Sequence, residues 1–179
     1  FYVPLPAGQD YQYPTERDDY RTVASALRRS GQVWCHNAKH ERFFWPGYYG
    51  KNWRDSMLLM WLLNKPAGER GYGLKALIKH HYNVDLPSFN DITRGRDVRA
   101  IPPEELCQYA CNDAFWSLQL GNDFCTETVT PLLATEMEMV TVVGSIEHRG
   151  MRIDTAALAA LKIGLAERSQ ALREEWDWL

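Results

Sequence analysis

The chain has 179 residues, of which 45% are hydrophobic and 24% charged, a composition that suits a globular core and excludes a disordered chain. Its formal net charge is −3, so any binding of nucleic acid has to come from a local basic patch rather than from the charge of the whole chain. No apolar run approaches the length of a membrane span and no signal peptide opens the sequence, so we expect a soluble, intracellular protein.

In chain order, the first predicted element is a short strand over residues 1–5, which Pro4 and Pro6 interrupt. A helix is predicted over residues 16–31, with basic residues in its last turn and Gly31 at its end. A short buried strand covers residues 32–37. A brief helix over residues 40–48 ends at Pro46-Gly47.

Residues 55–64, with the sequence DSMLLMWLLN, are apolar nearly throughout, and their periodicity fits a strand or a helix equally well. Residues 73–83 predict an amphipathic helix, and residues 85–102 predict a charged loop. A long helix then starts at Pro103 with acidic residues in its first turn, as is typical of helix N-termini.

The pattern changes after Thr130. Residues 131–150 predict a second long helix that stops at Gly150, and an extended link follows. Asp154 is a suitable N-cap for a last helix, which has apolar residues at heptad-like spacing, namely Leu158, Leu161, Leu165, Leu172, Trp176 and Leu179. We expect this helix to dock on a neighbouring domain. Since the sequence starts in a strand-like run without Met and ends inside a helical pattern, we expect a fragment of a longer protein.

The sequence has no CxxC pair among its four cysteines, which are Cys35, Cys107, Cys111 and Cys125. Cys107 and Cys111 are four residues apart, a spacing that offers a metal two thiols on one helix. The nearest histidine pair, His80-His81, lacks the spacing of a zinc site. We therefore expect reduced, buried thiols and no zinc site.

Two pairs of polar residues are candidates for a site. Asn37 and Glu41 are four residues apart. If the buried strand ends at His36, a helix that starts at the next residue places both on one face, at the strand end where α/β proteins carry their sites. Tyr109 and Asp113 have the same spacing on a largely apolar helix. There an Asp needs a partner or a metal, because burying an unpaired carboxylate is costly. The alternative is that Asp113 is an exposed helix residue and Tyr109 a core residue.

Five segments, in order, resemble the 3′→5′ proofreading exonuclease domain of family A, DNA polymerase I-like polymerases. WCHNAKHE is similar to the family's strand followed by HN-x-K-[FY]-D, and DSMLLMWLLN is similar to DTML-x-x-YLLN. YGLKALIKHHYN resembles the family's LKxLAxxYL helix, and YACNDAFWSLQL resembles its Y-x-x-x-D-A motif. IEHRGMRID resembles the link that leads into the polymerase domain. Together these segments cover roughly residues 1–155.

The resemblance implies an α/β, RNase H-like fold of the DEDD exonuclease superfamily, with a mixed sheet flanked by helices, incomplete at its N-terminus and extended by C-terminal helices. Residues 1–129 would be the exonuclease domain and residues 130–179 the connection to a polymerase domain in cis. The implied activity is hydrolysis of the 3′-terminal phosphodiester of DNA with two Mg²⁺ or Mn²⁺ ions. The implied partner is the single-stranded 3′ end of a primer–template. The implied location is the cytoplasm of a bacterium or of a phage's host.

The resemblance also assigns roles to residues. Asp113 would be the third-motif metal ligand, Tyr109 would orient the attacking water, and Asn37 would help to position the site and the bound strand. Glu41 stands where the family usually has Asp, as a ligand of the second metal. One extra CH₂ moves a carboxylate by about 1.5 Å, and a misplacement near 1 Å costs on the order of 100-fold in rate.

A second departure from the family pattern is the absence of its first motif, D-x-E, since Asp18-Asp19 lie in the wrong context. We expect this motif upstream in the parent protein, and little activity from the fragment alone. Basic residues in two segments are candidates for binding phosphates, namely Lys75, Lys79 and His80 on the predicted helix and Arg94 and Arg96 on the following loop. The alternatives are a catalytically inactive, structural or DNA-holding module of a polymerase, and a ribonuclease D-like exoribonuclease.

Overall fold

The computed structural model of the chain describes residues 18–44, 52–68 and 71–176. It divides into two compact units, Phe1–Gly144 and Ser145–Leu179, which we describe separately. The strand expected over residues 1–5 lies outside the described residues, as does the end of the brief helix at Pro46-Gly47.

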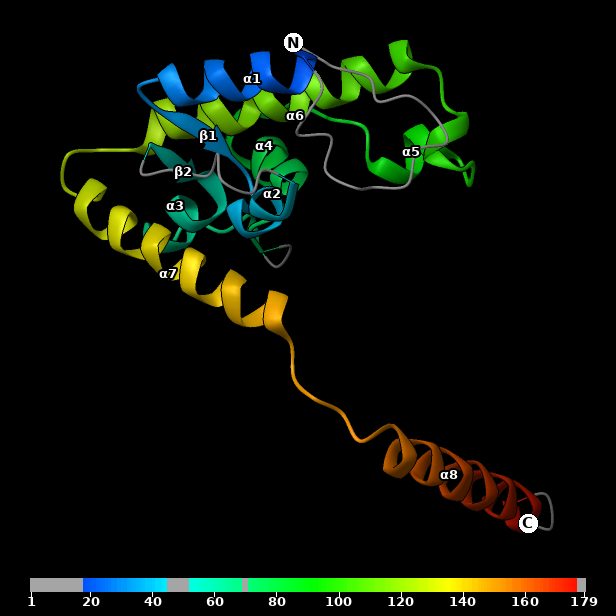
Figure 1. Ribbon diagram of the computed structural model, residues 1–179. Helices are drawn as coiled ribbons and strands as arrows, with labels where there is room; N and C mark the ends of the chain where they lie inside the picture. The colour runs from blue at the N-terminus through cyan, green and yellow to red at the C-terminus, as the bar shows by residue number, and fades with distance from the viewer. Residues whose placement is uncertain (1–17, 45–51, 69–70, 177–179) are drawn as a thin grey trace. The chain divides into compact units, whose positions relative to one another are not determined.

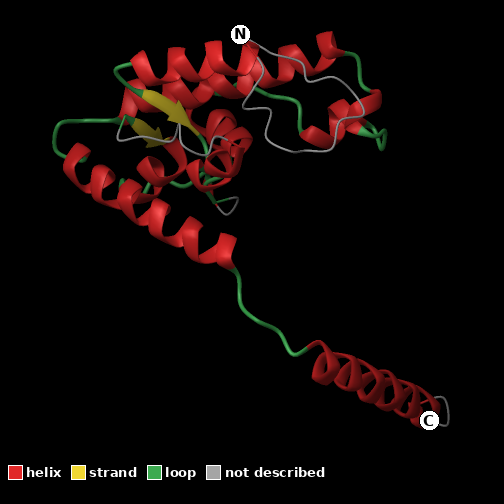
Figure 2. Ribbon diagram, viewed as in Figure 1, coloured by secondary structure: helices red, strands yellow, loops and turns green. Residues whose placement is uncertain are grey.

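The described part of the first unit is mostly helical around a small parallel sheet, so its content is of the α/β type (Figures 1 and 2). Its elements in order are α1 (Asp18–Arg29), β1 (Val33–Cys35), α2 (Ala38–Phe44), β2 (Trp53–Asp55), α3 (Ser56–Leu62), α4 (Leu74–Tyr82), α5 (Phe89–Thr93), the short 3₁₀ helix η2 (Val98–Ala100), α6 (Pro103–Phe124) and the greater part of α7 (Thr130–Arg149).

The two strands of the sheet run parallel. Val33 pairs with Trp53 and Cys35 pairs with Asp55. Because the strands are parallel and in this register, the residues that follow them, His36 and Ser56, emerge at the same edge of the sheet. The long helix α6 contacts both strands (Figure 1).

Among the described residues of the unit, two hydrophobic clusters form, and α3 belongs to both. Leu59 packs in a cluster with residues of α2, β2 and α7, whereas the next residue, Met60, packs in a cluster with residues of α4 and α6. Both side chains are fully buried. A helix that is covered on opposite sides is apolar around most of its circumference, which explains why the periodicity of residues 55–64 did not distinguish a helix from a strand. The segment is strand β2 up to Asp55 and a helix afterwards.

The segment predicted as a loop over residues 85–102 contains helical structure. The short helix α5 begins with a capping box, in which the Ser88 hydroxyl accepts a hydrogen bond from the Asp91 N–H while the Asp91 carboxylate accepts one from the Ser88 N–H. The loop prediction was wrong here because α5 has only five residues, too few to show a helical period.

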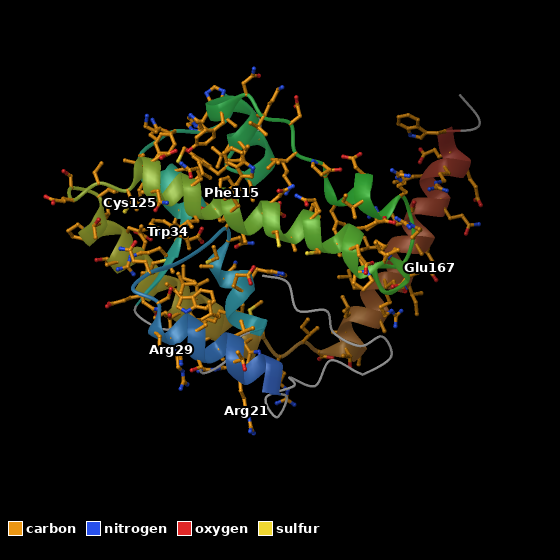
Figure 3. The ribbon with its side chains drawn as sticks, turned by 90° about the horizontal axis from the view of Figure 1, so that it is seen from above. Arg21, Arg29, Trp34, Phe115, Cys125 and Glu167 are labelled. Atoms are coloured by element: carbon orange, nitrogen blue, oxygen red, sulfur yellow. The ribbon has the colours of Figure 1, made fainter. Side chains whose placement is uncertain are left out.

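A buried glycine sets the distance between α6 and the sheet. Gly121 of α6 lies against the indole of Trp34 of β1, which is labelled in Figure 3. A Cβ atom at position 121 would lie 2.7 Å from the Trp34 Cε3 atom, well inside van der Waals contact. Only a residue without a side chain lets the helix approach the strand this closely.

Replacing Gly121 by alanine is therefore expected to destabilise the first unit by about 2 kcal/mol. Overpacking costs about 1–3 kcal/mol, which exceeds the gain of at most about 1 kcal/mol in helix propensity. Urea unfolding followed by tryptophan fluorescence measures the change. Gly164→Ala is the matched control, because Gly164 is helical and has open space around it. Equal unfolding free energies for the wild type and Gly121→Ala would show that the contact with Trp34 is not tight.

The second unit contains the end of α7, an extended link and α8 (Thr155–Trp176). Gly150 ends α7 in the left-handed conformation, with φ of 66°. Asp154 caps α8 as expected, since its Oδ1 accepts hydrogen bonds from the N–H groups of Ala156 and Ala157, each 3.0 Å long. Every α8 side chain within the unit is exposed, and the docking of its apolar positions on another domain stays a prediction. Within the described ranges, no helix is both long and apolar enough to span a membrane.

Candidate functional site

One buried carboxylate organises the edge of the sheet. Asp55, at the end of β2, is 1% exposed. Its Oδ2 accepts a hydrogen bond of 2.7 Å from the Ala38 N–H, and its Oδ1 accepts one of 3.1 Å from the Asn37 N–H at the start of α2. The same Oδ1 accepts bonds of 2.8 and 3.4 Å from the N–H groups of Met57 and Leu58 at the start of α3. Asp55 thus caps two helices at once, with the positive ends of both helix dipoles directed at its negative charge.

Asn37 and Glu41 lie just before and within helix α2, the start of which Asp55 caps. Asn37 has a φ of 71° and precedes α2, so the i, i+4 spacing of a helix does not by itself align its side chain with Glu41. Glu41 lies in α2 and is partly buried. Burial raises the pKa of the Glu41 carboxyl, the charge of His40 opposes this effect, and the negative charge of Asp55 adds to it. The surroundings of Glu41 therefore favour its neutral form more than water does.

His36 connects the edge of the sheet to the rest of the unit. Its Nδ1 lies 2.9 Å from the Ser56 hydroxyl, and its Nε2 lies 2.9 Å from the Tyr72 carbonyl oxygen. Since a carbonyl only accepts, Nε2 carries the proton of the neutral ring. The single Ser56 hydroxyl proton is then shared between Nδ1 and the Cys35 carbonyl oxygen, which lies 3.0 Å away. Burial lowers the pKa of His36. The Asp55 charge and the Tyr72 carbonyl oppose this shift, and the Lys75 charge adds to it.

The lowered pKa of His36 predicts a loss of stability in acid. Above the ordinary value of 6.5 the ring is neutral in both states, and as the pH falls below it the unfolded chain takes up a proton before the folded chain does. The free energy of unfolding should therefore decrease from about pH 7 to about pH 5, and His36→Gln should flatten this dependence. Urea unfolding at a series of pH values measures it, with His80→Gln on the exposed side of α4 as the control. The same pH dependence in His36→Gln and the wild type would contradict the prediction.

Tyr109 and Asp113 of α6 do face the same region, because one side chain of α4 contacts both. The Lys75 ammonium forms an ion pair with the Asp113 carboxylate, and its Nζ lies 4.5 Å from the centroid of the Tyr109 ring. The Asp113 side chain is 30% exposed and that of Lys75 27%. Desolvation lowers the pKa of Lys75 to about 8 and raises the pKa of Tyr109. Asp113 is therefore neither fully exposed nor unpaired, and it has a cation against it.

The His36 imidazole is influenced by one charged residue beside each of the two predicted pairs. The charges of Asp55, at the end of β2, and of Lys75, at the Asp113 pair, both act on the His36 imidazole. The interactions of Asp113 are with Lys75, whereas the charge of Glu41 acts together with those of His40 and Asp55.

Sequence reasoning missed three residues of this region. Asp55 directly precedes the apolar helix α3, and this N-cap position was the available signal. His36 belongs to the segment WCHNAKHE, but no role was predicted for it from the sequence. Phe89 of α5 is 49% exposed, and its ring centroid lies 6.4 Å from that of Tyr109 in a T-shaped contact. No pattern in the sequence indicates that α5 places an exposed aromatic ring beside Tyr109.

The remaining predicted phosphate-binding residues lie on α4 and around α5, and several of them have acidic partners. Lys79 forms an ion pair of 2.5 Å with Asp85, and Arg96 forms one of 2.8 Å with Glu105. The Nε of Arg94 donates to the Asp91 carbonyl oxygen, and His80 is exposed beside His81. Exposed ion pairs contribute at most about 1 kcal/mol, so Lys79 and Arg96 can exchange these partners for phosphates.

The described residues fit one part of a site for Mg²⁺ or Mn²⁺. Asp113 offers carboxylate oxygens, the ligands that these ions prefer, and the Lys75 ammonium shows that a positive charge is accommodated against them. A Mg²⁺ ion takes about six oxygen ligands. In ranges 18–44, 52–68 and 71–176, no group of three or more His, Cys, Asp or Glu side chains is arranged to hold a metal.

Comparisons of the chain with protein-family models, with curated proteins and with solved structures found no match. The functional inference therefore comes from the residues themselves. In the structure, Lys75 contacts both Tyr109 and Asp113. Asp55 accepts hydrogen bonds from Asn37 and Ala38 at the start of α2, the helix that contains Glu41.

Proposed function

We propose that the chain is the 3′→5′ exonuclease domain of a DNA polymerase I-like protein, with an RNase H-like fold, and that it removes mispaired nucleotides from the 3′ end of a primer. The observation that supports this most is the cluster of Lys75, Tyr109 and Asp113, in which a phenol, a carboxylate and an ammonium converge from two helices. The helix that carries two of these residues packs on parallel strands whose carboxyl ends lead to Asn37 and Glu41.

Tyr109 and Lys75 of the cluster, and the neighbouring Phe89, each have a role in phosphodiester hydrolysis. The Tyr109 hydroxyl accepts a hydrogen bond from the attacking water and orients it toward the phosphorus. The Lys75 ammonium binds a phosphate oxygen once the substrate enters, because it already lies at the site as a desolvated cation. Phe89 offers an exposed ring on which a nucleobase stacks, an interaction that tolerates any base. Bound Mg²⁺ or Mn²⁺ ions would lower the pKa of the water and neutralise charge on the phosphate.

Asp113 and Glu41 would be this chain's metal ligands, with the remaining carboxylates supplied by residues outside the sequence. Asn37 would help to hold the end of the strand. The more distant phosphates of the single-stranded 3′ end would lie along α4 and the α5 segment, near Lys79, His80, Arg94 and Arg96. A polymerase domain in cis would deliver the primer–template, and the compartment would be the cytoplasm of a bacterium or of a phage-infected cell.

The test uses the full-length protein that contains this chain. A 5′-labelled primer with a mismatched 3′ nucleotide, annealed to a template, is incubated with Mg²⁺ and without deoxynucleotides. The expected result is stepwise shortening from the 3′ end that a chelator stops. Shortening of an RNA 3′ end but not of DNA would favour a ribonuclease D-like exoribonuclease instead.

The second candidate is a catalytically inactive module that holds DNA within a polymerase. The Lys75–Asp113 ion pair favours it, because it neutralises the carboxylate that the reaction would need. This candidate predicts binding of single-stranded DNA without any shortening of the primer. A binding assay and the degradation assay on one protein preparation separate the two functions.

A further inference from the structure

Two of the four cysteines form a pair that the proposed reaction does not use. Cys107 and Cys111 lie on α6, both are partly exposed, and their Sγ atoms are 4.0 Å apart. Cys35 and Cys125 have other neighbours, since the Cys35 Sγ lies 3.3 Å from the Arg54 carbonyl oxygen and the Cys125 Sγ lies 3.5 Å from the Thr130 hydroxyl. Cys107 and Cys111 are thus a dithiol already in contact.

We propose that Cys107 and Cys111 are a reversible redox modification site, which a hydroperoxide closes to a disulfide within α6. One thiol attacks the peroxide and becomes a sulfenic acid while the peroxide is reduced to an alcohol, or to water if it is hydrogen peroxide. The second thiol attacks this sulfenic sulfur, the S–S bond forms, and the sulfenic oxygen leaves as water together with the thiol proton. The two sulfurs lose two electrons in total, which the peroxide takes up. A dithiol reductant reverses the change.

Closing the disulfide distorts the helix. On a regular helix the Cβ atoms of residues four apart are about 5–6 Å from each other, whereas a disulfide requires about 3.5–4.5 Å. The turn between Cys107 and Cys111 must therefore bend or tighten by about 1–2 Å. A bond strained in this way is easily reduced, so the site responds to changes in oxidant rather than staying closed.

The distortion falls on the turn that carries Tyr109. This residue lies inside the ring closed by the disulfide, and Asp113 lies two residues beyond Cys111. A displacement near 1 Å of a positioned group costs on the order of 100-fold in rate. Oxidation therefore switches the site off, a consequence that rests on the proposed exonuclease function, whereas formation of the disulfide does not.

The first experiment measures the disulfide itself on the full chain. The wild type is treated with hydrogen peroxide, free thiols are counted under denaturing conditions, and peptide mass spectrometry locates the loss of two hydrogens. We expect the free thiols to fall from four to two, with a link between Cys107 and Cys111 that dithiothreitol removes. Cys107→Ser and Cys111→Ser should each lose this link, and the control Cys125→Ser should keep it. Disulfides between chains, or sulfinic acid at Cys107 in place of the link, would overturn the proposal.

The second experiment measures the effect of the disulfide on helix content and on the exonuclease rate. Far-UV circular dichroism of the oxidised chain should show a small, reversible loss of helix, which Cys107→Ser abolishes. The exonuclease rate of the full-length protein should fall on the order of 100-fold on oxidation and recover with dithiothreitol. If the link and the loss of helix form but no exonuclease activity exists before oxidation, the proposed function fails and the redox site stands. If no link forms, the redox site fails whatever the activity is.

Discussion

Replacing Asp55 by alanine is expected to lower the free energy of unfolding of the first unit by about 4 kcal/mol. The buried carboxylate accepts four backbone hydrogen bonds, from Asn37, Ala38, Met57 and Leu58. Hydrogen bonds to a charged group contribute about 1.5–3 kcal/mol each, and part of this is recovered when water reaches the vacated helix ends. Losses of this size arise when a buried hydrogen-bond network is broken.

Two further variants make this result specific. Asp55→Asn keeps one acceptor oxygen and the volume of the side chain, and should cost about half as much because it loses the charge and two or more of the bonds. Asp154→Ala removes an exposed cap from one helix, α8, and should cost about 1 kcal/mol. Urea unfolding followed by tryptophan fluorescence and by circular dichroism measures all three variants. A loss for Asp55→Ala no larger than that for Asp154→Ala would mean that Asp55 does not hold two helices together.

The sequence was sufficient to predict the elements that have a clear period and clear ends. The strand at Val33–Cys35, the amphipathic helix α4 and the long helix α6 that starts at Pro103 all form as predicted. The sequence was insufficient where tertiary contacts decide the structure. Helix α3 is buried on two sides, so its sequence shows no alternation of apolar and polar faces. Helix α5 is stabilised by a local capping box rather than by an apolar face.

The candidate site, too, was only partly predictable from the sequence. The i, i+4 spacing of Tyr109 and Asp113 placed both on one side of α6, where Lys75 contacts them. The same reasoning was weaker for Asn37, because its backbone turns to positive φ before α2 begins. The ion pair between Lys75 and Asp113 joins residues far apart in the sequence, and only the packing of α4 on α6 brings them together.

Replacing Asp113 by alanine is expected to lower the exonuclease rate of the full-length protein by 100-fold or more. Asp113 is the carboxylate beside Lys75 and Tyr109, and a site that loses a positioned ligand or displaces one by about 1 Å loses on the order of 100-fold. The substitution also leaves the Lys75 ammonium without its partner, so Asp113→Asn is made in parallel to preserve the shape of the side chain. Thermal unfolding confirms that both variants are folded.

The matched control is Asp123→Ala on the same helix. Asp123 is an exposed aspartate that accepts hydrogen bonds from Tyr82 and Gln119, away from the Lys75–Asp113 pair. Its loss should leave the exonuclease rate within about twofold of the wild type, since removing an exposed surface contact changes little.

The most direct measurement is therefore the rate at which a mismatched 3′-terminal nucleotide is removed by the wild type, Asp113→Ala and Asp123→Ala in the presence of Mg²⁺. Removal by the wild type and by Asp123→Ala, with Asp113→Ala slower by 100-fold or more, is the result expected for an exonuclease site built around Asp113. Equal rates for Asp113→Ala and the wild type, or no removal by the full-length wild type, would contradict it.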